Sequence, residues 1–378
     1  MIKYAEHLCR ILHNFDDCTT ADNTIIELNK QAKLNFFKQN LFVFHQCLYI
    51  NDPRINQYKS EIQQLYDSIE LHHYTNVDTL EKILNGQTLR LSQITRMNDY
   101  DEAMALIKHN MHVFYKHVCL HNCISRLSHI ISTIETYAFE LYTFSLSTRG
   151  DDAAQWERYG IRKNQNMVTG HSLCNICKEI MNKIKSWFVK TGNNSDSPCG
   201  VCIKIPMKKL RKKIEGLKSK YEILEIEPIA YTQDYAQNNP VLDFITKIAL
   251  SRTDKEIKLI HEALSQHLGD EDTVAVFNNL PQLKTRFTYK NLIMYSSQVK
   301  HESFNSESEI RLVLRENLFE PQMSDHIMLN VGNFNDLISS IMIGPGADHI
   351  EGRVADLLKK HNLDKTVKIE KRKCSLRT

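Results

Sequence analysis

Apolar residues recur at helical spacing through the first part of the chain. Apolar side chains three or four residues apart share one face of an α-helix, and another element has to cover that face. Pro53 opens a further segment of this kind, because proline is favoured in the first turn of a helix. We therefore expect residues 1–68 to form a helical arm or a small bundle. The residues that carry the pattern are Tyr4, Leu8, Ile11, Leu12, Ile25, Leu28, Ala32, Phe36 and Phe37.

Short apolar or alternating runs begin at Leu71 and continue to the C-terminal part of the chain. Such runs, separated by Gly-, Asn- and Ser-containing segments, are typical of β-strands. They follow no regular β-α-β rhythm, which favours an α+β fold for residues 69–378. We expect helical insertions in this part near 104–138, 161–198 and 235–288. The predicted strands are 71–75, 88–92, 141–147, 201–205, 224–231, 309–314, 326–331, 338–343 and one near 367.

Two short helices have recognisable start signals. The first covers residues 77–84, with Thr75 as its N-cap, Asp78 as the partner of a capping box and Gly86 as its end. The second follows the strand at 141–147 and is capped by Asp151 or Asp152. Both helices therefore start close to the end of a predicted strand.

Composition narrows the class of protein. The 378 residues are 42% hydrophobic and 25% charged, with a mean hydropathy of −0.40, which is typical of a globular chain. No apolar run approaches the roughly 18 to 20 residues of a membrane span, and Lys3 interrupts what would be a signal core. We expect a cytoplasmic protein with no membrane partner. The net charge of +3 is too balanced for a protein that coats nucleic acid.

One predicted strand carries charged residues on a single face. Alternation in the segment 307–314 places Glu307, Glu309 and Arg311 together, opposite Ile310 and Leu312. Two carboxylates beside a guanidinium suit acid–base or electrostatic catalysis. A solvated sheet face with cross-strand ion pairs is the alternative explanation, and this stretch alone favours it.

Hydroxyl and imidazole groups occur on two other strands. Ser145 and Ser147 share one face of the strand at 141–147, where they either line a site or form its solvated side. His73, Tyr74 and Thr75 lie at a junction between a strand and a helix, where free backbone amides can bind an anion or a ribose oxygen. A histidine in such a place is more often structural.

Trp156 and Tyr159 are three residues apart in the short helix after Asp152. They share a helix face and could form one wall of a base-stacking pocket. A pair of this kind more often belongs to a core. The sequence alone favours the core.

The ten cysteines include two Cys-x-x-Cys pairs, which are Cys174 with Cys177 and Cys199 with Cys202. The spacing resembles a four-cysteine zinc site. However, the first pair lies inside an apparent helix, and Cys202 lies in an apolar strand pattern, where cysteine acts as a small hydrophobe. The sequence favours the account without metal and leaves zinc open.

A basic run extends from Lys204 to Lys220. A solvated helix face is the default explanation for such a run. It could instead steer a nucleic acid or an acidic partner toward the protein.

Taken together, these segments resemble the bacterial family catalogued as domain of unknown function 2971. The similarity covers the chain from about residue 70 to the C-terminus, and the long helical insertions and the N-terminal arm depart from it. Each matching piece is short, but the set occurs in the order of the family. The pieces are Leu71–Asn76, Leu89–Ser92, Met97–Glu102, Phe144–Ser147, Gln155–Tyr159, Gly200–Ile205, Ser306–Val313 and Ile341–Pro345.

The same elements are similar, more distantly, to the ADP-ribosyltransferase fold, a split β-sheet that binds NAD as substrate. The resemblance assigns the first-strand position to His73, the middle-strand position to Ser145 or Ser147, and the late-strand glutamates to Glu307 and Glu309. It also implies that Thr75 binds NAD.

These assignments imply a mechanism. Cleavage of the nicotinamide–ribose bond passes through an oxocarbenium-like state, which a carboxylate such as Glu309 stabilises. Glu307 would position or deprotonate the acceptor. His73, Tyr74 and Thr75 would bind ribose or carboxamide groups.

Two further roles complete the expected site. Trp156 or Tyr159 would stack on a ring of NAD. Arg311 would contact a phosphate or hold Glu309 in place.

We therefore expect an NAD-using ADP-ribosyltransferase-like enzyme, a bacterial toxin or anti-phage effector that modifies a macromolecule. An NAD glycohydrolase, with water as the acceptor, is one alternative. A non-catalytic module that binds a nucleotide or nucleic acid is another. The acceptor, the trigger, the oligomeric state and any regulatory protein partner stay open at this point.

Overall fold

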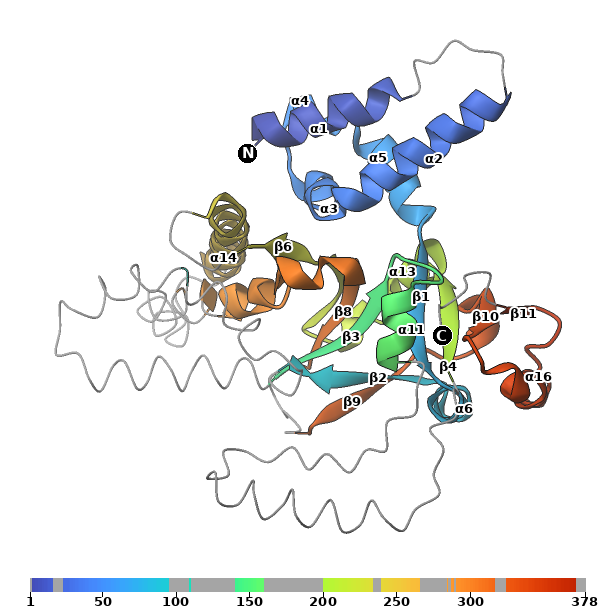
Figure 1. The fold of residues 1–378 in the computed structure, drawn as a ribbon. Coiled ribbons are helices and arrows are strands. Elements are labelled where there is room, and N and C mark those ends of the chain that lie inside the picture. Colours follow the sequence, from blue (N-terminus) through green and yellow to red (C-terminus); the bar gives the residue numbers. More distant parts are fainter. Residues whose placement is uncertain are drawn as a thin grey trace, which may run out of the picture. The chain divides into compact units, whose positions relative to one another are not determined.

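The computed structural model of the chain describes two compact units, which we treat separately (Figure 1). Unit 1 comprises residues 1–73, 86–150 and 205–338, and unit 2 comprises residues 74–85, 151–204 and 339–378. Both contain helices and strands, and the chain is of mixed α/β class with a mixed sheet. The described residues are 2–15, 23–94, 109, 140–159, 200–233, 239–265, 284, 287–288, 290–316 and 324–371.

The first part of unit 1 is helical, as the apolar spacing predicts. Leu12, Phe37, Phe44 and Ile62 are fully buried between these helices, and the rings of Phe37 and Phe44 stack with centroids 5.1 Å apart. The third helix also contacts a strand of the sheet. The helices are α1 (Ile2–Asn14), α2 (Asn23–Gln39), α3 (Leu41–Tyr49), α4 (Pro53–Asn56) and α5 (Lys59–Asp67), and the strand that α3 contacts is β5 (Ile223–Pro228).

The strands of unit 1 are arranged around β3 (Leu141–Ser147). Along its whole length β3 pairs antiparallel with β8 (Glu309–Arg315), which in turn pairs with β5. The opposite edge of β3 is divided: β2 (Thr88–Gln93) pairs with its start, and β1 (Glu70–Asn76) pairs at its last residue, Ser147. The sheet therefore forks at β3, and β9 (His326–Asn330) extends the β2 branch.

Helices cover one face of the sheet of unit 1. Leu141, Ile223 and Val313 belong to a buried cluster that also contains residues of α3, of α14 (Pro240–Ser265) and of the helical residues 290–296. Leu141 and Ile223 both lie opposite Arg315 of β8, and Val313 is two residues from Arg315 on the same strand, so the three residues share one face. This is the face toward which the odd-numbered residues of β8 point.

Unit 2 contains β4 (Gly200–Pro206) antiparallel to β10 (Ser340–Ile343), with β11 (Lys368–Lys371) parallel to β10. Its helices are α6 (Val77–Gly86), α11 (Ala153–Tyr159) and α16 (Glu351–Lys360). Gly344 is required for the close packing of α11: a Cβ atom there would lie 2.8 Å from the ring of Trp156 and 3.0 Å from the carbonyl oxygen of Gly200. A side chain at this position would push the helix away from the sheet.

Most predicted elements are present, with shifted ends. The strand predicted over 224–231 is instead two strands, β5 and β6 (Ala230–Thr232), and β6 pairs with β7 (Val299–His301) in a separate small sheet. The predicted cap of α6 is wrong: the side chain of Asn76, not Thr75, accepts a hydrogen bond from the amide of Thr79 at 2.8 Å. Thr75 remains part of β1.

Asp152 caps α11 as predicted, because its carboxylate accepts hydrogen bonds from the amides of Ala154 and Gln155 at 3.0 and 3.2 Å. The basic run contributes α13 (Met207–Glu215) and a short 3-10 helix, η3 (Lys218–Lys220). The helical insertions expected near 104–138 and 161–198 lie outside the described residues, apart from His109. Within the described part of the chain, no helix combines the length and apolar character that a membrane span requires.

Candidate functional site

The register of the sheet decides which predicted site residues share a face. Ser147 lies opposite Glu309, and Ser145 lies opposite Arg311, across the β3–β8 pair. Directly paired residues of antiparallel strands point to the same side. The serines, the glutamate and the arginine therefore lie on one face of the forked sheet, as the resemblance implies for the two later strands.

His73 lies on the other face, so its predicted place beside Glu309 is wrong. The residue of β1 that pairs with Ser147 is His72, and its neighbour His73 therefore points to the opposite side. The His73 ring packs on Phe144 with centroids 4.3 Å apart, and its Nδ1 lies 3.2 Å from the carbonyl oxygen of Ser145. Burial lowers the pKa of His73 to about 4, so it is neutral at pH 7.

His72 takes the place on the Glu309 face that the sequence assigns to His73. Its Nδ1 lies 3.3 Å from the carbonyl oxygen of Ser147. Its ring fills the space beside Gly150, where a Cβ atom would lie 2.7 Å from Nε2. Both residues 72 and 73 are histidines, so the sequence alone cannot tell which of them faces Glu309. The register of β1 against β3 is needed for that choice.

Glu309 is the centre of a buried ion cluster. The guanidinium of Arg311 donates to both carboxylate oxygens of Glu309, at 2.8 and 3.2 Å, and the ammonium of Lys300 lies 2.8 Å from Oε2. Arg311 is fully buried and also donates to the carbonyl oxygen of Ser297 at 2.6 Å. The side chain of Glu309 is 4% exposed. We call Glu307, Glu309, Arg311 and Lys300 the Glu309 cluster.

The charges of this cluster fix the state of Glu309. Burial alone would raise the pKa of a carboxyl group. Arg311 and Lys300 more than offset burial and lower the pKa of Glu309 to about 2. Glu309 is therefore an anion throughout the physiological range, which electrostatic stabilisation of a developing cation requires.

Glu307 belongs to the cluster, but it does not lie on the strand that the sequence pattern predicts. It ends the 3-10 helix η4 (Glu302–Glu307), and Ser308 adopts the left-handed conformation with φ 43° and ψ 52°. The expectation that Glu307 lies on the same strand as Glu309 is thus wrong, because the strand starts only at Glu309. Lys300 brings the two carboxylates together, since its ammonium also lies 2.7 Å from Oε2 of Glu307.

Hydroxyl groups hold the backbone around the two glutamates. Ser147 donates from its Oγ to the carbonyl oxygen of Glu307 at 2.7 Å. The amide of Glu309 donates to the phenolic oxygen of Tyr231 at 2.8 Å. Arg149, an exposed residue, donates to Oγ of Ser308 at 2.8 Å. Lys300, Tyr231 and Arg149 were missed by sequence reasoning, because no local pattern in the sequence links them to Glu307 or Glu309.

The residues expected to stack on a ring of NAD lie in unit 2. Trp156 is 1% exposed and belongs to a buried cluster with Tyr74, Cys202 and Met342. Tyr74 meets the indole edge-on at 4.9 Å, and the indole nitrogen donates to Asp151 at 2.9 Å. Trp156 is thus a core residue whose ring has no face open to a ligand.

The other predicted residues of unit 2 give little further support. The Tyr74 hydroxyl accepts a hydrogen bond from the amide of Asp152 at 3.1 Å, and Thr75 is buried. The side chain of Tyr159 lies outside the described residues. Its proposed role stays a prediction.

The cysteine pairs are described only in part. Cys202 is buried in the apolar cluster with Trp156, which agrees with its interpretation as a small hydrophobe. Cys174, Cys177 and Cys199 lie outside the described residues. Among the residues that are described, no group of three or more His, Cys, Asp or Glu side chains is placed to hold a metal ion.

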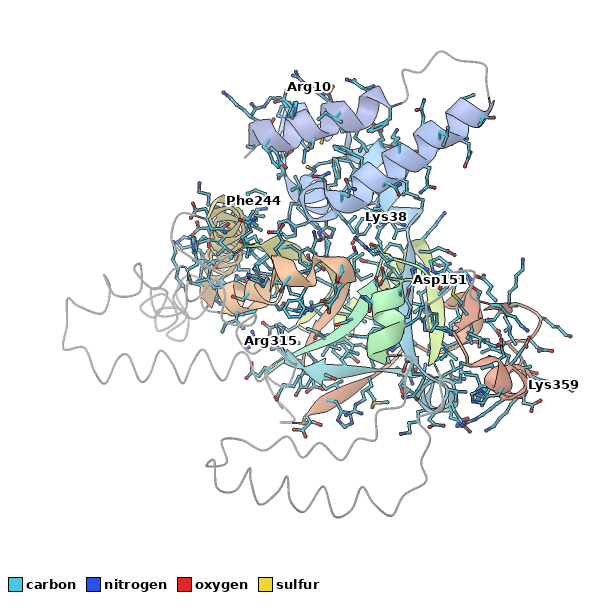
Figure 2. The ribbon with its side chains drawn as sticks, in the orientation of Figure 1. Arg10, Lys38, Asp151, Phe244, Arg315 and Lys359 are labelled. Carbon is cyan, nitrogen blue, oxygen red and sulfur yellow. The ribbon has the colours of Figure 1, made fainter. Side chains whose placement is uncertain are left out.

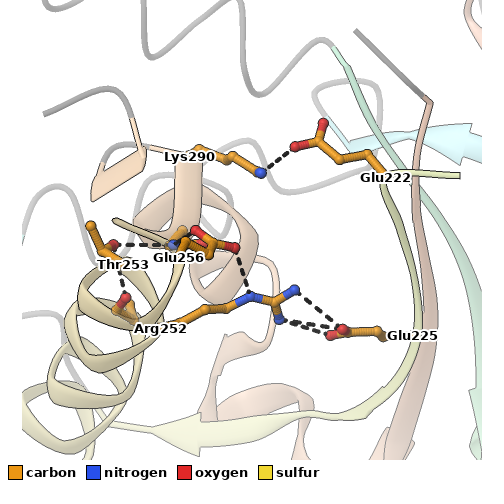
Figure 3. Close-up of polar contacts among 8 residues, drawn as sticks. Glu222, Glu225, Arg252, Thr253, Glu256 and Lys290 are labelled. Carbon is orange, nitrogen blue, oxygen red and sulfur yellow. Dashed lines mark hydrogen bonds and ion pairs between the residues drawn. The ribbon is translucent and has the colours of Figure 1, made fainter. Parts of the chain in front are cut away.

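A second polar cluster lies on β5, on the same face of the sheet. Figure 3 shows Arg252 of α14 reaching Glu225, whose carboxylate accepts at 3.2 to 3.3 Å. Glu227, two residues further, is buried, and its Oε2 lies 3.5 Å from Nδ1 of His45. Burial and the negative charge of Glu225 raise the pKa of Glu227 well above its ordinary value, and burial lowers that of His45 to about 4.

Comparison with known proteins finds no matching family model, no matching curated protein and no matching solved structure. The function therefore has to be argued from the geometry of the Glu309 cluster and from the forked sheet.

Proposed function

We propose that this protein is an NAD-using ADP-ribosyltransferase-like enzyme, acting on a macromolecular acceptor as a bacterial toxin or anti-phage effector. The Glu309 cluster is its catalytic centre. The observation that carries the proposal is an anionic glutamate, Glu309, at the first residue of β8, with a second carboxylate held beside it by Lys300. The fork at β3 supports the split-sheet fold that such an enzyme needs.

The two carboxylates suit different steps. The nicotinamide–ribose bond breaks with positive charge developing on the ribose, and the fixed anion Glu309 stabilises that charge. Glu307 is the more accessible of the pair, with 12% of its side chain exposed against 4% for Glu309. It is therefore the better placed to meet the acceptor group and accept its proton.

Some of the described residues suit the binding of NAD, and others do not. The carboxylates and the exposed guanidinium of Arg149 suit a ribose and a phosphate. His73 and Trp156 do not suit their assigned roles, because His73 lies on the other face of the sheet and Trp156 is packed in a core. We therefore assign no ring-stacking step to Trp156 and place the imidazole of the site at His72.

One observation favours a second candidate, a non-catalytic nucleotide-binding module. Both oxygens of Glu309 already contact a cation within the protein, and such partners reduce the field that the carboxylate offers to a substrate. If the cluster only stabilises the fold, the protein binds a nucleotide without cleaving it. An NAD glycohydrolase would share the site and differ only in using water as acceptor.

The test is nicotinamide release from NAD by the pure protein, with and without a cell extract as the source of acceptor. Glu309→Gln keeps the shape and removes the charge, so the rate should fall by about two to three orders of magnitude. Toxicity on expression in a bacterial host should fall in parallel. Release that needs the extract indicates a transferase, and release without it indicates a glycohydrolase.

The control has to account for stability, because Glu309→Gln removes the carboxylate that the buried guanidinium of Arg311 contacts. Glu140→Gln is the matched variant: it removes a carboxylate from Arg315, a buried arginine at the far end of the same strand (Figure 2). Arg315 keeps Glu222, at 3.3 Å, as a second partner. Full activity in Glu140→Gln and loss in Glu309→Gln support the proposal. Equal rates in Glu309→Gln and the wild type, or no release by the wild type, contradict it.

A further inference from the structure

The helix α13 separates its residues sharply by character. Met207, Leu210 and Ile214 are buried, and the helix packs with this side on α5 and β5 of unit 1. Lys208 and Lys212, one turn apart, are exposed. The helix is held by its buried side, and the ammonium groups on its other side stay in solvent.

This segment holds an excess of the positive charge of the chain. Residues 207–220 contain seven basic residues and a single acidic one, Glu215, which gives the segment a charge of +6. The whole chain carries +3, so the remaining residues carry −3. The modest net charge therefore hides a strongly basic patch on a slightly acidic protein.

Within the part of the chain that the structure describes, carboxylates neutralise only part of this charge. Arg211 pairs with Asp67, and Lys218 pairs with Glu215 at 2.8 Å. Among the residues that the structure describes, four lysines of α13 have no carboxylate partner; they are Lys208, Lys209, Lys212 and Lys213. We call these four the α13 lysines.

We propose that the α13 lysines form a binding surface for the phosphate backbone of a nucleic acid. Protein–protein interfaces are built around apolar and aromatic anchors and are depleted in lysine. The apolar residues of α13 are buried, so the exposed side offers charge without an anchor. Backbone binding of nucleic acid needs charge alone, through release of the counterions of the phosphates. This inference does not depend on NAD chemistry.

The experiment measures binding of the full chain to a fluorescent single-stranded RNA of about 20 nucleotides, without NAD, by fluorescence anisotropy. Four phosphate contacts with a single strand predict about a 50-fold weaker affinity at 200 mM than at 50 mM salt. Replacement of all four α13 lysines by Gln should remove most of this salt dependence and weaken binding at 50 mM salt by about 10-fold or more. Because two of the four are exposed and two half-buried, circular dichroism should show an unchanged fold.

The matched control removes four exposed lysines elsewhere and leaves α13 intact. Its substitutions are Lys82→Gln, Lys255→Gln, Lys359→Gln and Lys365→Gln. Both variants lose the same charge, so only a local effect separates them. Normal RNA binding by the control and loss in the α13 variant support the inference. Equal loss in both, no binding by the wild type, or competition by poly-glutamate as strong as by unlabelled RNA overturns it.

Discussion

Glu309 and Glu227 are two buried carboxyl groups on neighbouring strands whose pKa values are shifted in opposite directions. Glu227 lies directly opposite Arg311 across the β5–β8 pair, and both glutamates are about 5% exposed. The pKa of Glu309 is lowered to about 2, whereas that of Glu227 is raised well above its ordinary value. Depth in the protein therefore does not decide the direction in which the pKa of a carboxyl group in this sheet is shifted.

The difference lies in the cations that each group contacts. Arg311 and Lys300 both contact Glu309. Glu227 faces Glu225, which is already paired with Arg252, and His45, whose own pKa burial lowers to about 4. Arg311 of β8 lies directly opposite Glu227 of β5, yet its guanidinium donates to Glu309. The direction of one guanidinium thus helps to lower the pKa of Glu309 on β8, while the pKa of Glu227 on β5 stays raised.

The largest expected effect comes from removing that guanidinium. Arg311→Met leaves Glu309 buried with only Lys300 as counter-ion, and loss of one partner of a buried ion pair costs about 3–5 kcal/mol. Urea unfolding followed by circular dichroism measures the change in the free energy of unfolding. A loss below about 1 kcal/mol would mean that solvent reaches Glu309.

Acid should destabilise the protein through Glu309. Its pKa is about 2 in the folded state and near 4.5 when unperturbed, so the folded state binds fewer protons between these values. The contribution of Glu309 is therefore complete above about pH 4.5 and is lost as the pH falls toward 2, at about 1.4 kcal/mol per pH unit. Unfolding free energies measured from pH 5 to pH 3 should fall less steeply in Glu309→Gln than in the wild type.

Glu227 should have the opposite effect, because its pKa is higher in the folded state than in the unfolded state. Folding then takes up a proton at pH values between the unfolded and the folded pKa, and stability falls as the pH rises from about 4.5 toward the folded pKa. Glu227→Gln removes this cost and should stabilise the protein at pH 7. The gain should vanish near pH 4. Destabilisation at pH 7 would show that Glu227 is an anion paired with a charged His45.

The smallest effect is expected where the same kinds of groups are exposed. Arg353 of unit 2 pairs with Asp78 at 2.8 Å and Glu81 at 2.6 Å, but nearly half of its side chain is in solvent. Arg353→Ala should change the free energy of unfolding by about 0–1 kcal/mol, and this remainder should shrink in 0.5 M salt. A change as large as that of Arg311→Met would remove burial as the explanation of the difference.

The sequence predicts local features of the fold well. The ends of β3 are found at Leu141 and Ser147 as expected, because a short alternating run is a local pattern. Asp152 is an N-cap as expected, since the capping oxygen and its two amides lie within three residues. Elements of this kind need no knowledge of distant parts of the chain.

The candidate site depends on features that no local pattern contains. Which of His72 and His73 faces Glu309 is set by the register of β1 against β3, 75 residues away. The left-handed conformation of Ser308 ends the alternation that would place Glu307 on β8. Lys300 joins the site through a turn of 3-10 helix. The residue types could be predicted, but their arrangement could not.

Two cysteines at the contact between α1 and α3 can report how often the N-terminal helices of unit 1 open. Cys9 and Cys47 are both fully buried, with sulfur atoms 4.0 Å apart, and burial together with the neighbouring thiol raises the pKa of Cys9. A thiol reagent can modify either sulfur only while the helices are open, so the labelling rate reports how often this layer opens. If α1 and α3 separate in one step, the labelling rates of Cys9 in Cys47→Ala and of Cys47 in Cys9→Ala will coincide. Unequal rates would mean that one helix frays while the other stays packed.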